Sequence, residues 1–387
     1  MKKLLSLFIL TLLPLIASAD DSGSCGENVT YTYVESTKTL IISGTGDMTD
    51  FAVNATKPWT SYKNDIETLI IEDGVTSIGE WTFSDCGIKT VSIGNSVTTI
   101  NNSAFSSSGK IEAVSFGSGI TTIGRDAFSG CYSLNSLMLN DALTSIGNSA
   151  FFNCRALTSI NIPRNVQNIG STPFGYCYKL ASITVDDENS TFDSRGDCNA
   201  IIKTATNELI VGCKNTVIPS TIDIIGASSF IGCSNLLSIV IPSGVTSIDN
   251  NAFSFCTGLT SIVIPNTVNS IGINPFTGCE GIEAINVEEG NDNYDSRGNC
   301  NAIINTSTNT LISGCKNTII PNSVISIGTA AFRGSGLSSI TIPNSVTTIG
   351  NYVLSGCKFL TDIVIGTGIT AIGNNFFSGN NTVNIRI

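Results

Sequence analysis

Residues 259–279, LTSIVIPNTVNSIGINPFTGC, contain one complete unit of a pattern that recurs along most of this chain. Ile262 and Ile264 alternate with other residues, which is the periodicity of a half-buried β-strand. Pro265 predicts a turn after this strand, and a second short strand follows the turn. The glycine after the second strand then begins a tight helical turn that directs Phe276 toward the interior. One unit therefore predicts two short strands, a turn between them and a helical turn after the second strand.

The unit repeats in register, and its most regular mark is an isoleucine followed by Gly, Asn or Asp. These isoleucines lie 22 or 23 residues apart, except across two gaps of 56 residues. They are Ile78, Ile100, Ile123, Ile146, Ile169, Ile225, Ile248, Ile271, Ile327, Ile349 and Ile372. The fifth residue after each isoleucine is a phenylalanine, with Leu354 as the exception. No unit can bury its apolar side alone, so the units must stack into a repeat solenoid. Stacking forms one column of isoleucines and one column of phenylalanines, and we expect both columns to be buried.

Two insertions account for the long gaps, because each is one 23-residue unit that carries 33 extra residues. They span about residues 186–217 and 288–319, and their sequences are near copies of each other. In both, apolar residues lie on the two arms of an apparent hairpin. Since 33 extra residues would interrupt the ladder of one coil, we expect each insertion to leave the rod as a separate lobe.

The repeated unit resembles the leucine-rich repeats of the BspA-like surface proteins, as in residues 259–279 and in LSSITIPNSVTTIGNYVLSGC at 337–357. The resemblance covers about residues 66–387, and residues 20–65 look like the β-rich N-terminal cap of such proteins. It implies a β-rich solenoid of the leucine-rich-repeat type with short helical turns. It also implies a non-enzymatic, adhesin-type protein that binds host extracellular-matrix or cell-surface proteins or microbial surface partners. Glycans are a further class of ligand that we consider, because stacked hydroxyls on the strands would form a hydrogen-bonding face.

The first nineteen residues predict a signal peptide. Lys2 and Lys3 precede an apolar run at 4–16, and Ala17-Ser-Ala19 provides a cleavage site after it. The run is too short to span a bilayer, and turn residues interrupt every later apolar stretch, so no membrane span is predicted. We therefore expect a secreted or cell-surface protein.

Composition excludes several classes of function. The chain has 19 Lys+Arg against 30 Asp+Glu, for a net charge of −11, and it contains no histidine. An acidic chain is a poor partner for nucleic acid, and histidine-based triads and metal sites are excluded. No catalytic residue, metal or cofactor is predicted. The alternatives to a binding scaffold are a polysaccharide-active enzyme on a β-solenoid and a purely structural surface component.

The thirteen cysteines form two sets and one single residue, Cys25, which is either free or tied to the first repeat. Eight lie eight residues after the repeat isoleucine: Cys86, Cys131, Cys154, Cys177, Cys233, Cys256, Cys279 and Cys357. Stacked side chains in a column point in parallel, which favours buried thiols over disulfides between coils. The second set, Cys198/Cys213 and Cys300/Cys315, lies at the open ends of the two predicted hairpins. There we predict disulfides, with unpaired buried thiols as the alternative.

Three surface features are candidate binding sites. A column of threonines precedes the repeat isoleucines and offers a hydroxyl-bearing face, although threonine also simply suits a strand. Its members include Thr98, Thr121, Thr144, Thr246 and Thr347. The tripeptide Arg195-Gly196-Asp197 is the motif of integrin ligands, but the second insertion carries Arg297-Gly298-Asn299, which favours a turn common to both insertions. The acidic segment 186–188 is either a Ca²⁺ ligand set or, as we favour, a solvated loop.

Overall fold

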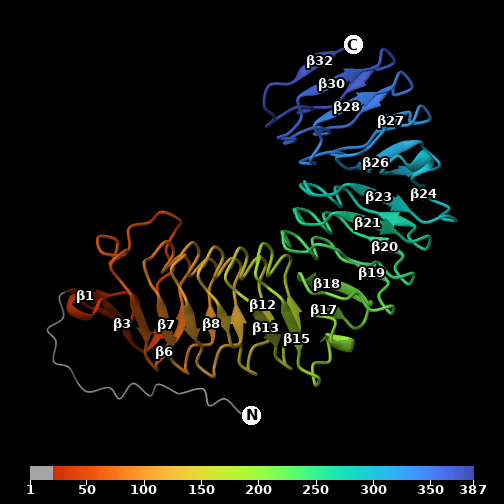
Figure 1. Ribbon diagram of the computed structural model, residues 1–387. Helices are drawn as coiled ribbons and strands as arrows, with labels where there is room; N and C mark the ends of the chain where they lie inside the picture. The colour runs from red at the N-terminus through yellow and green to blue at the C-terminus, as the bar shows by residue number, and fades with distance from the viewer. Residues whose placement is uncertain (1–20) are drawn as a thin grey trace.

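The computed structural model describes residues 21–387, and the predicted signal peptide at 1–19 lies outside them. Stacked coils form a β-solenoid that runs from β1 at one end to β32 at the other (Figure 1). This confirms the predicted repeat solenoid. The third side of each coil consists of hydrogen-bonded turns that are too short for α-helix. Helix in the described residues is limited to three 3-10 segments: η1 (Glu35–Thr37), η2 (Arg195–Asp197) and η3 (Arg297–Asn299).

The N-terminal end is closed by an antiparallel sheet that continues directly into the solenoid. Its strands are β1 (Asp21–Ser24), β2 (Val29–Val34) and β3 (Thr39–Gly44). β3 then pairs in parallel with β5 (Thr68–Ile71), the first repeat strand on that side. The buried ring of Trp59 stacks on Phe83 with centroids 5.2 Å apart, and so covers the open end of the phenylalanine column.

Two parallel ladders run along the first half of the solenoid. The first contains β5, β7 (Thr90–Ile93), β9 (Ala113–Ser115) and β11 (Ser136–Leu137), followed by the pair β13 (Ser159–Ile162) and β15 (Ser182–Val185). The second contains β4 (Gly46–Asp47), β6 (Val75–Ile78), β8 (Thr99–Ile100), β10 (Thr122–Ile123), β12 (Ser145–Ile146) and β14 (Asn168–Ile169). The register places each repeat isoleucine beside the next, as with Ile123 and Ile146.

The same arrangement continues after each insertion. The second half contains the strands β19 (Ile224–Ile225), β20 (Ser247–Ile248), β21 (Ser261–Ile264), β22 (Ser270–Ile271), β23 (Ala284–Val287), β27 (Ser326–Ile327), β28 (Ser339–Ile342), β29 (Thr348–Ile349), β30 (Asp362–Ile365), β31 (Ala371–Ile372) and β32 (Asn384–Arg386). Within residues 21–387, no helix is long and apolar enough to span a bilayer.

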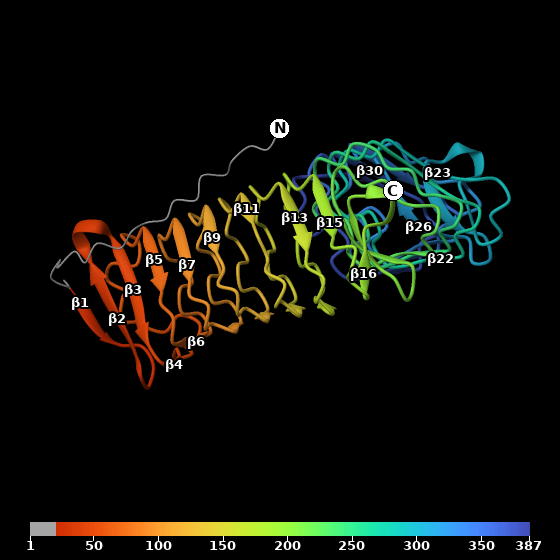
Figure 2. The ribbon, with the colours of Figure 1, turned by 90° about the horizontal axis from the view of Figure 1, so that it is seen from below.

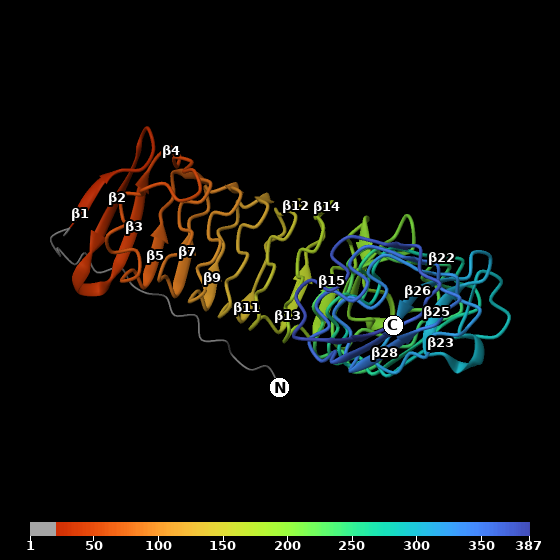
Figure 3. The ribbon, with the colours of Figure 1, turned by 90° about the horizontal axis from the view of Figure 1, so that it is seen from above.

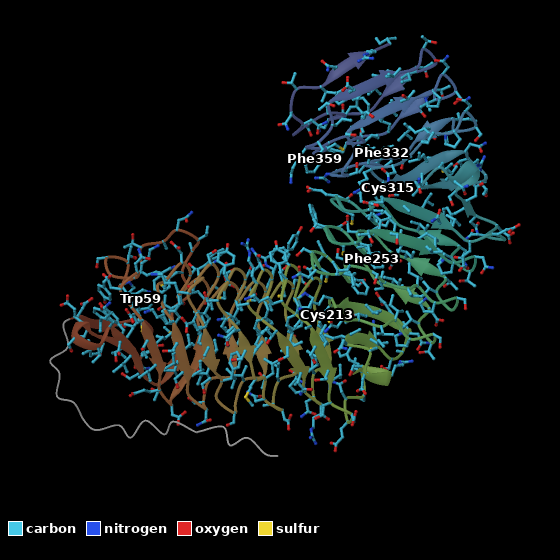
Figure 4. The ribbon with its side chains drawn as sticks, in the orientation of Figure 1. Trp59, Cys213, Phe253, Cys315, Phe332 and Phe359 are labelled. Carbon is cyan, nitrogen blue, oxygen red and sulfur yellow. The ribbon has the colours of Figure 1, made fainter. Side chains whose placement is uncertain are left out.

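The phenylalanine column is buried as predicted, apart from the half-buried Phe377 in the last coil. Between Phe83 and Phe174, adjacent rings stack with centroids 5.0–5.5 Å apart. Figure 4 marks Trp59, Phe253 and Phe332 at successive places along this interior. The isoleucine column is buried except at Ile169, Ile271 and Ile372, where our prediction of burial throughout is wrong. These three lie in β14, β22 and β31, each the last strand of its sheet, so no following coil covers them.

The two insertions are not lobes, contrary to our prediction. In the first, the hairpin β17 (Ala200–Lys203) and β18 (Glu208–Gly212) lies within a sheet with the order β16-β17-β18-β19-β20-β22, where β16 is Phe192–Asp193. The second repeats this with β24 (Tyr294–Asp295), β25 (Ala302–Asn305) and β26 (Thr310–Gly314). Ile201, Ile202 and Leu209 are fully buried. Each hairpin adds apolar side chains to the core, and so it stacks in line with the coils.

Each hairpin also separates two hydrophobic cores. Ile201 belongs to the core on its N-terminal side, whereas Ile202 and Leu209 belong to the core on its C-terminal side. The second hairpin divides the chain in the same way. The solenoid thus consists of three blocks, which meet at the hairpins of residues 200–212 and 302–314.

The rod bends at both junctions. On the turn side the coils stay in direct contact, because the Tyr176 amide donates to the Ile231 carbonyl (3.1 Å) and the Gly278 amide to the Arg333 carbonyl (2.9 Å). The extra strands therefore widen only the strand-bearing side, which lies on the outside of the bend in Figure 1. Figures 2 and 3 show the result: the first block is seen from its side while the later coils are seen end-on.

Candidate functional site

The threonine column lies on the surface, but its hydroxyls bond to the solenoid itself. Thr121 Oγ1 donates to the Thr98 carbonyl at 3.1 Å, and Thr144 Oγ1 donates to the Thr121 carbonyl at the same distance. Thr98, Thr246 and Thr347 bond to the preceding coil in the same way, each at 3.2 Å. These hydroxyls connect neighbouring coils, so the column is a structural ladder as well as a surface.

The Arg195-Gly196-Asp197 tripeptide forms the 3-10 turn η2. The Arg195 guanidinium pairs with Asp193 (Nη2–Oδ2 2.6 Å) and donates to Asn207 Oδ1 at 3.1 Å. Arg297 makes the same contacts in the second insertion, with Asp295 at 2.7 Å and Asn309 at 2.9 Å. Because both arginines hold their own turns in place, the geometry supports the turn interpretation over that of a free integrin ligand.

The acidic segment that opens the first insertion faces a cation. Arg164 pairs with Glu188 at 2.5 Å and with Asp186 at 3.5 Å. Across residues 21–387, no group of three or more Cys, Asp or Glu side chains has the arrangement of a metal site. These carboxylates form a surface ion-pair network.

The column cysteines are free thiols that bond to the backbone, and all of them are buried except the partly exposed Cys233. Cys256 Sγ donates to the Phe230 carbonyl at 3.2 Å and Cys279 Sγ to the Phe253 carbonyl at 3.1 Å, in each case from the preceding coil. Ser108 occupies the same position in another coil and donates to the Phe83 carbonyl at 2.6 Å. Burial raises the pKa of Cys279 to about 12, which keeps the thiol neutral. A small donor that satisfies the phenylalanine carbonyl is thus the common requirement of this position.

The predicted disulfides of the insertions are wrong in this structure, where all four cysteines are free buried thiols. Had the pairing of Ile202 with Leu209 continued along the hairpin, Cys198 would lie opposite Cys213. A bulge between Ile201 and Ile202 shifts the register by one residue, so that Cys213 lies level with Asn199.

That one-residue shift places the two sulfur atoms on opposite faces of the hairpin. Cys213 Sγ lies 3.4 Å from the Asn199 carbonyl oxygen, in the core of the first block, whereas Cys198 belongs to the core of the second. The second insertion has the same bulge and the same separation of Cys300 from Cys315. Cys25 is also a free and buried thiol.

A groove of about 770 Å³ with both polar and apolar lining lies where the first block ends. Its lining includes residues of β14 and, from the insertion, Phe192, Lys203 and Glu208. At the second junction, the amide of Ile271 donates to the hydroxyl of Tyr294 at 3.1 Å. Phe192 takes the position of Tyr294 at the first junction and has no hydroxyl, so the corresponding strand edge lacks this bond.

An exposed apolar patch lies on the second block, and our sequence reasoning missed it. Val217, Leu237, Val240 and Val263 are 71%, 67%, 81% and 47% exposed. Val217, Val240 and Val263 occupy the same repeat position in consecutive coils, which is a signal that the 23-residue alignment contains. In the third block Ser338 and Thr341 replace Leu237 and Val240, whereas the equivalents of Val217 and Val263 are the exposed Ile319 and Val364. The Leu237 and Val240 part of the patch is therefore what distinguishes the second block.

Comparisons with known proteins agree with this architecture. The family model described as BspA type leucine rich repeat region, in six copies, matches residues 60–194, 209–311 and 303–387. A leucine-rich repeat protein of Eubacterium ventriosum is 25% identical with a TM-score of 0.71, and the match covers 93% of this chain and 95% of that one. A leucine rich cell surface protein of Faecalibacterium prausnitzii is 23% identical with a TM-score of 0.50, covering 93% and 98%. No curated protein sequence gave a significant match.

Proposed function

The chain belongs to the family of BspA-type leucine-rich repeat proteins, and from this premise we propose that it is an exported, non-enzymatic binding scaffold. It acts at the cell surface or as a secreted protein, as the signal peptide predicted at residues 1–19 indicates. Its proposed partners are host extracellular-matrix or cell-surface proteins, or surface molecules of other microbes.

The apolar patch of Val217, Leu237, Val240 and Val263 is the observation that carries this proposal. Exposed apolar side chains that gather in one place mark sites of protein interaction more often than scattered ones do. The patch lies on a rigid stack of coils, which limits the ordering cost that binding incurs. The repeated hydroxyls and thiols, in contrast, bond to neighbouring coils and are poor candidates for catalysis.

The test is capture of partners by the mature chain from matrix and cell-surface fractions, alongside assays for hydrolysis and lyase activity on polysaccharides. We expect capture without turnover. A double variant, Leu237→Ser with Val240→Thr, introduces the residues found in the third block and should reduce capture at least tenfold. The control is the reverse exchange in the third block, Ser338→Leu with Thr341→Val. Turnover of a polysaccharide would instead support the enzymatic alternative, and absence of capture from every fraction would count against the scaffold.

A further inference from the structure

Three side chains at the end of the first block form a stack of two tyrosines around one arginine. Tyr132, Arg155 and Tyr178 each directly follow a column cysteine, in three consecutive coils. The Arg155 guanidinium carbon lies 4.7 Å from the ring centroid of Tyr132 and 5.6 Å from that of Tyr178. Arg155 Nε donates to Asn153 Oδ1 at 2.8 Å. Both faces of the guanidinium and its Nε are therefore held in place.

Among the described residues, Arg155 and Arg333 are the two arginines without a carboxylate partner, and Arg155 is the one that lies between two tyrosine rings. Of the seven arginines in residues 21–387, five have a carboxylate oxygen within 4.0 Å. Arg155 has none among the described residues, although the chain carries 30 acidic side chains against 19 basic ones. The guanidinium is thus ordered by stacking while its two terminal nitrogens stay available for a partner.

Further aromatic rings extend the stack across the first bend. Tyr176 contacts Phe152 and Tyr178 in the first block and Phe255 in the second, with centroids 5.1, 6.2 and 5.7 Å apart. Tyr132 is 45% exposed and Phe255 39% exposed. The surface therefore combines exposed aromatic area with one unpaired cation, and both blocks contribute to it.

We infer that this Tyr132–Arg155–Tyr178 stack recognises a protein segment that carries a carboxylate next to an apolar side chain. The carboxylate pairs with the terminal nitrogens of the guanidinium, a geometry that arginine provides and lysine does not. The neighbouring apolar side chain contacts the exposed aromatic surface. Tyrosine and arginine are, with tryptophan, the residues that most often dominate the binding energy of protein interfaces. The inference rests on the proposed function, since it assigns one site and one ligand chemistry to the binding scaffold.

Selection from a library of random displayed peptides on the full mature chain tests the inference directly. We expect enriched peptides to carry Asp or Glu beside an apolar residue. Their affinity should fall at least tenfold in Arg155→Gln and also in Arg155→Lys, which keeps the charge but loses the planar fork. Arg125→Gln is the matched control, because Arg125 is an exposed arginine of the same block that pairs with Asp126, and it should leave affinity unchanged.

Three outcomes overturn the inference: enriched peptides without carboxylates, equal binding by the Arg155→Gln chain, or Arg155-dependent binding of acidic polysaccharides alone. Circular dichroism of each variant confirms that it is folded. If Arg155→Gln does not fold, Arg155→Lys, which retains the stacked cation, provides the test. Failure here is distinguishable from failure of the proposed function. Capture from matrix or cell-surface fractions that Arg155→Gln leaves unchanged would refute this site and leave the scaffold function standing.

Discussion

Replacing Phe253 by alanine should reduce the stability of the second block by about 3–5 kcal/mol. The ring is fully buried and stacks between Phe230 and Phe276, with centroids at 5.0 and 5.6 Å. The coils on either side cannot easily collapse into the cavity, because ladder bonds such as that from the Phe253 amide to the Pro275 carbonyl (2.9 Å) fix their spacing. We therefore expect a value toward the upper end of this range.

The two tryptophans make the assay specific to one block, since Trp59 and Trp81 both lie near the N-terminus. In urea, far-UV circular dichroism reports the whole solenoid, whereas tryptophan emission reports the first block. Because a hairpin separates the two cores, Phe253→Ala should produce an earlier transition in circular dichroism and leave the emission midpoint unchanged. Phe128→Ala, whose ring stacks at 5.0 and 5.4 Å, should shift the emission midpoint instead.

Two results would refute this reasoning. Equal shifts of both signals in the Phe253→Ala variant would show that the hairpin couples the blocks rather than separating them. A loss below about 1 kcal/mol would show that the ring is not a core contact, since truncation of a buried phenylalanine costs several times more.

Three further predictions concern single contacts. Tyr294→Phe should destabilise the protein by about 0.5–1.5 kcal/mol, because it removes a hydrogen bond to a strand edge. Phe192→Tyr should add the equivalent bond at the first junction and raise the melting temperature. An unchanged stability in both variants would show that the strand edge needs no acceptor. Burial raises the pKa of the Cys279 thiol to about 12. The contribution of this thiol to folding stability is therefore complete below about pH 8.5, and it declines by up to ~1.4 kcal/mol per pH unit as the pH rises toward 12. Cys279→Ser should reduce this dependence of stability on pH, measured by urea unfolding at several pH values. Gly232→Ala should lower the melting temperature more than Gly196→Ala does. Both glycines have φ near +70°, but only at position 232 would the new Cβ lie 2.6 Å from a tyrosine ring. Equal decreases in melting temperature would show that backbone strain alone accounts for the effect.

The sequence was sufficient to predict the solenoid because its 23-residue period states which residues are neighbours. Burial of the phenylalanines and of most isoleucines follows from stacking alone. Ile169, Ile271 and Ile372 lie at sheet ends, and their exposure depends on what the next segment does. A repeat pattern describes an interior coil and does not describe a coil whose neighbour is missing.

The insertions were mispredicted for a related reason. Their length suggested lobes, but the apolar residues on both faces of the hairpin allow it to stack between two cores. The bulge between Ile201 and Ile202 places Cys198 and Cys213 on opposite faces of the hairpin, so that they do not pair. A bulge depends on local pairing that sequence spacing does not reveal. The Tyr132–Arg155–Tyr178 stack, in contrast, occurs at the repeat interval and could have been found by aligning the coils.

Polar residues that recur in the repeat and residues that differ between coils have different roles in this solenoid. Thr121, Cys256 and their equivalents use their donors on the preceding coil, which explains why they recur in most units. A side chain engaged in this way offers little to a partner. Residues that depart from the repeat are not needed for such bonds, and Arg155 and Leu237 are both of this kind. Recognition by this protein should therefore depend on positions where neighbouring coils differ, while the residues that the coils share hold them in register.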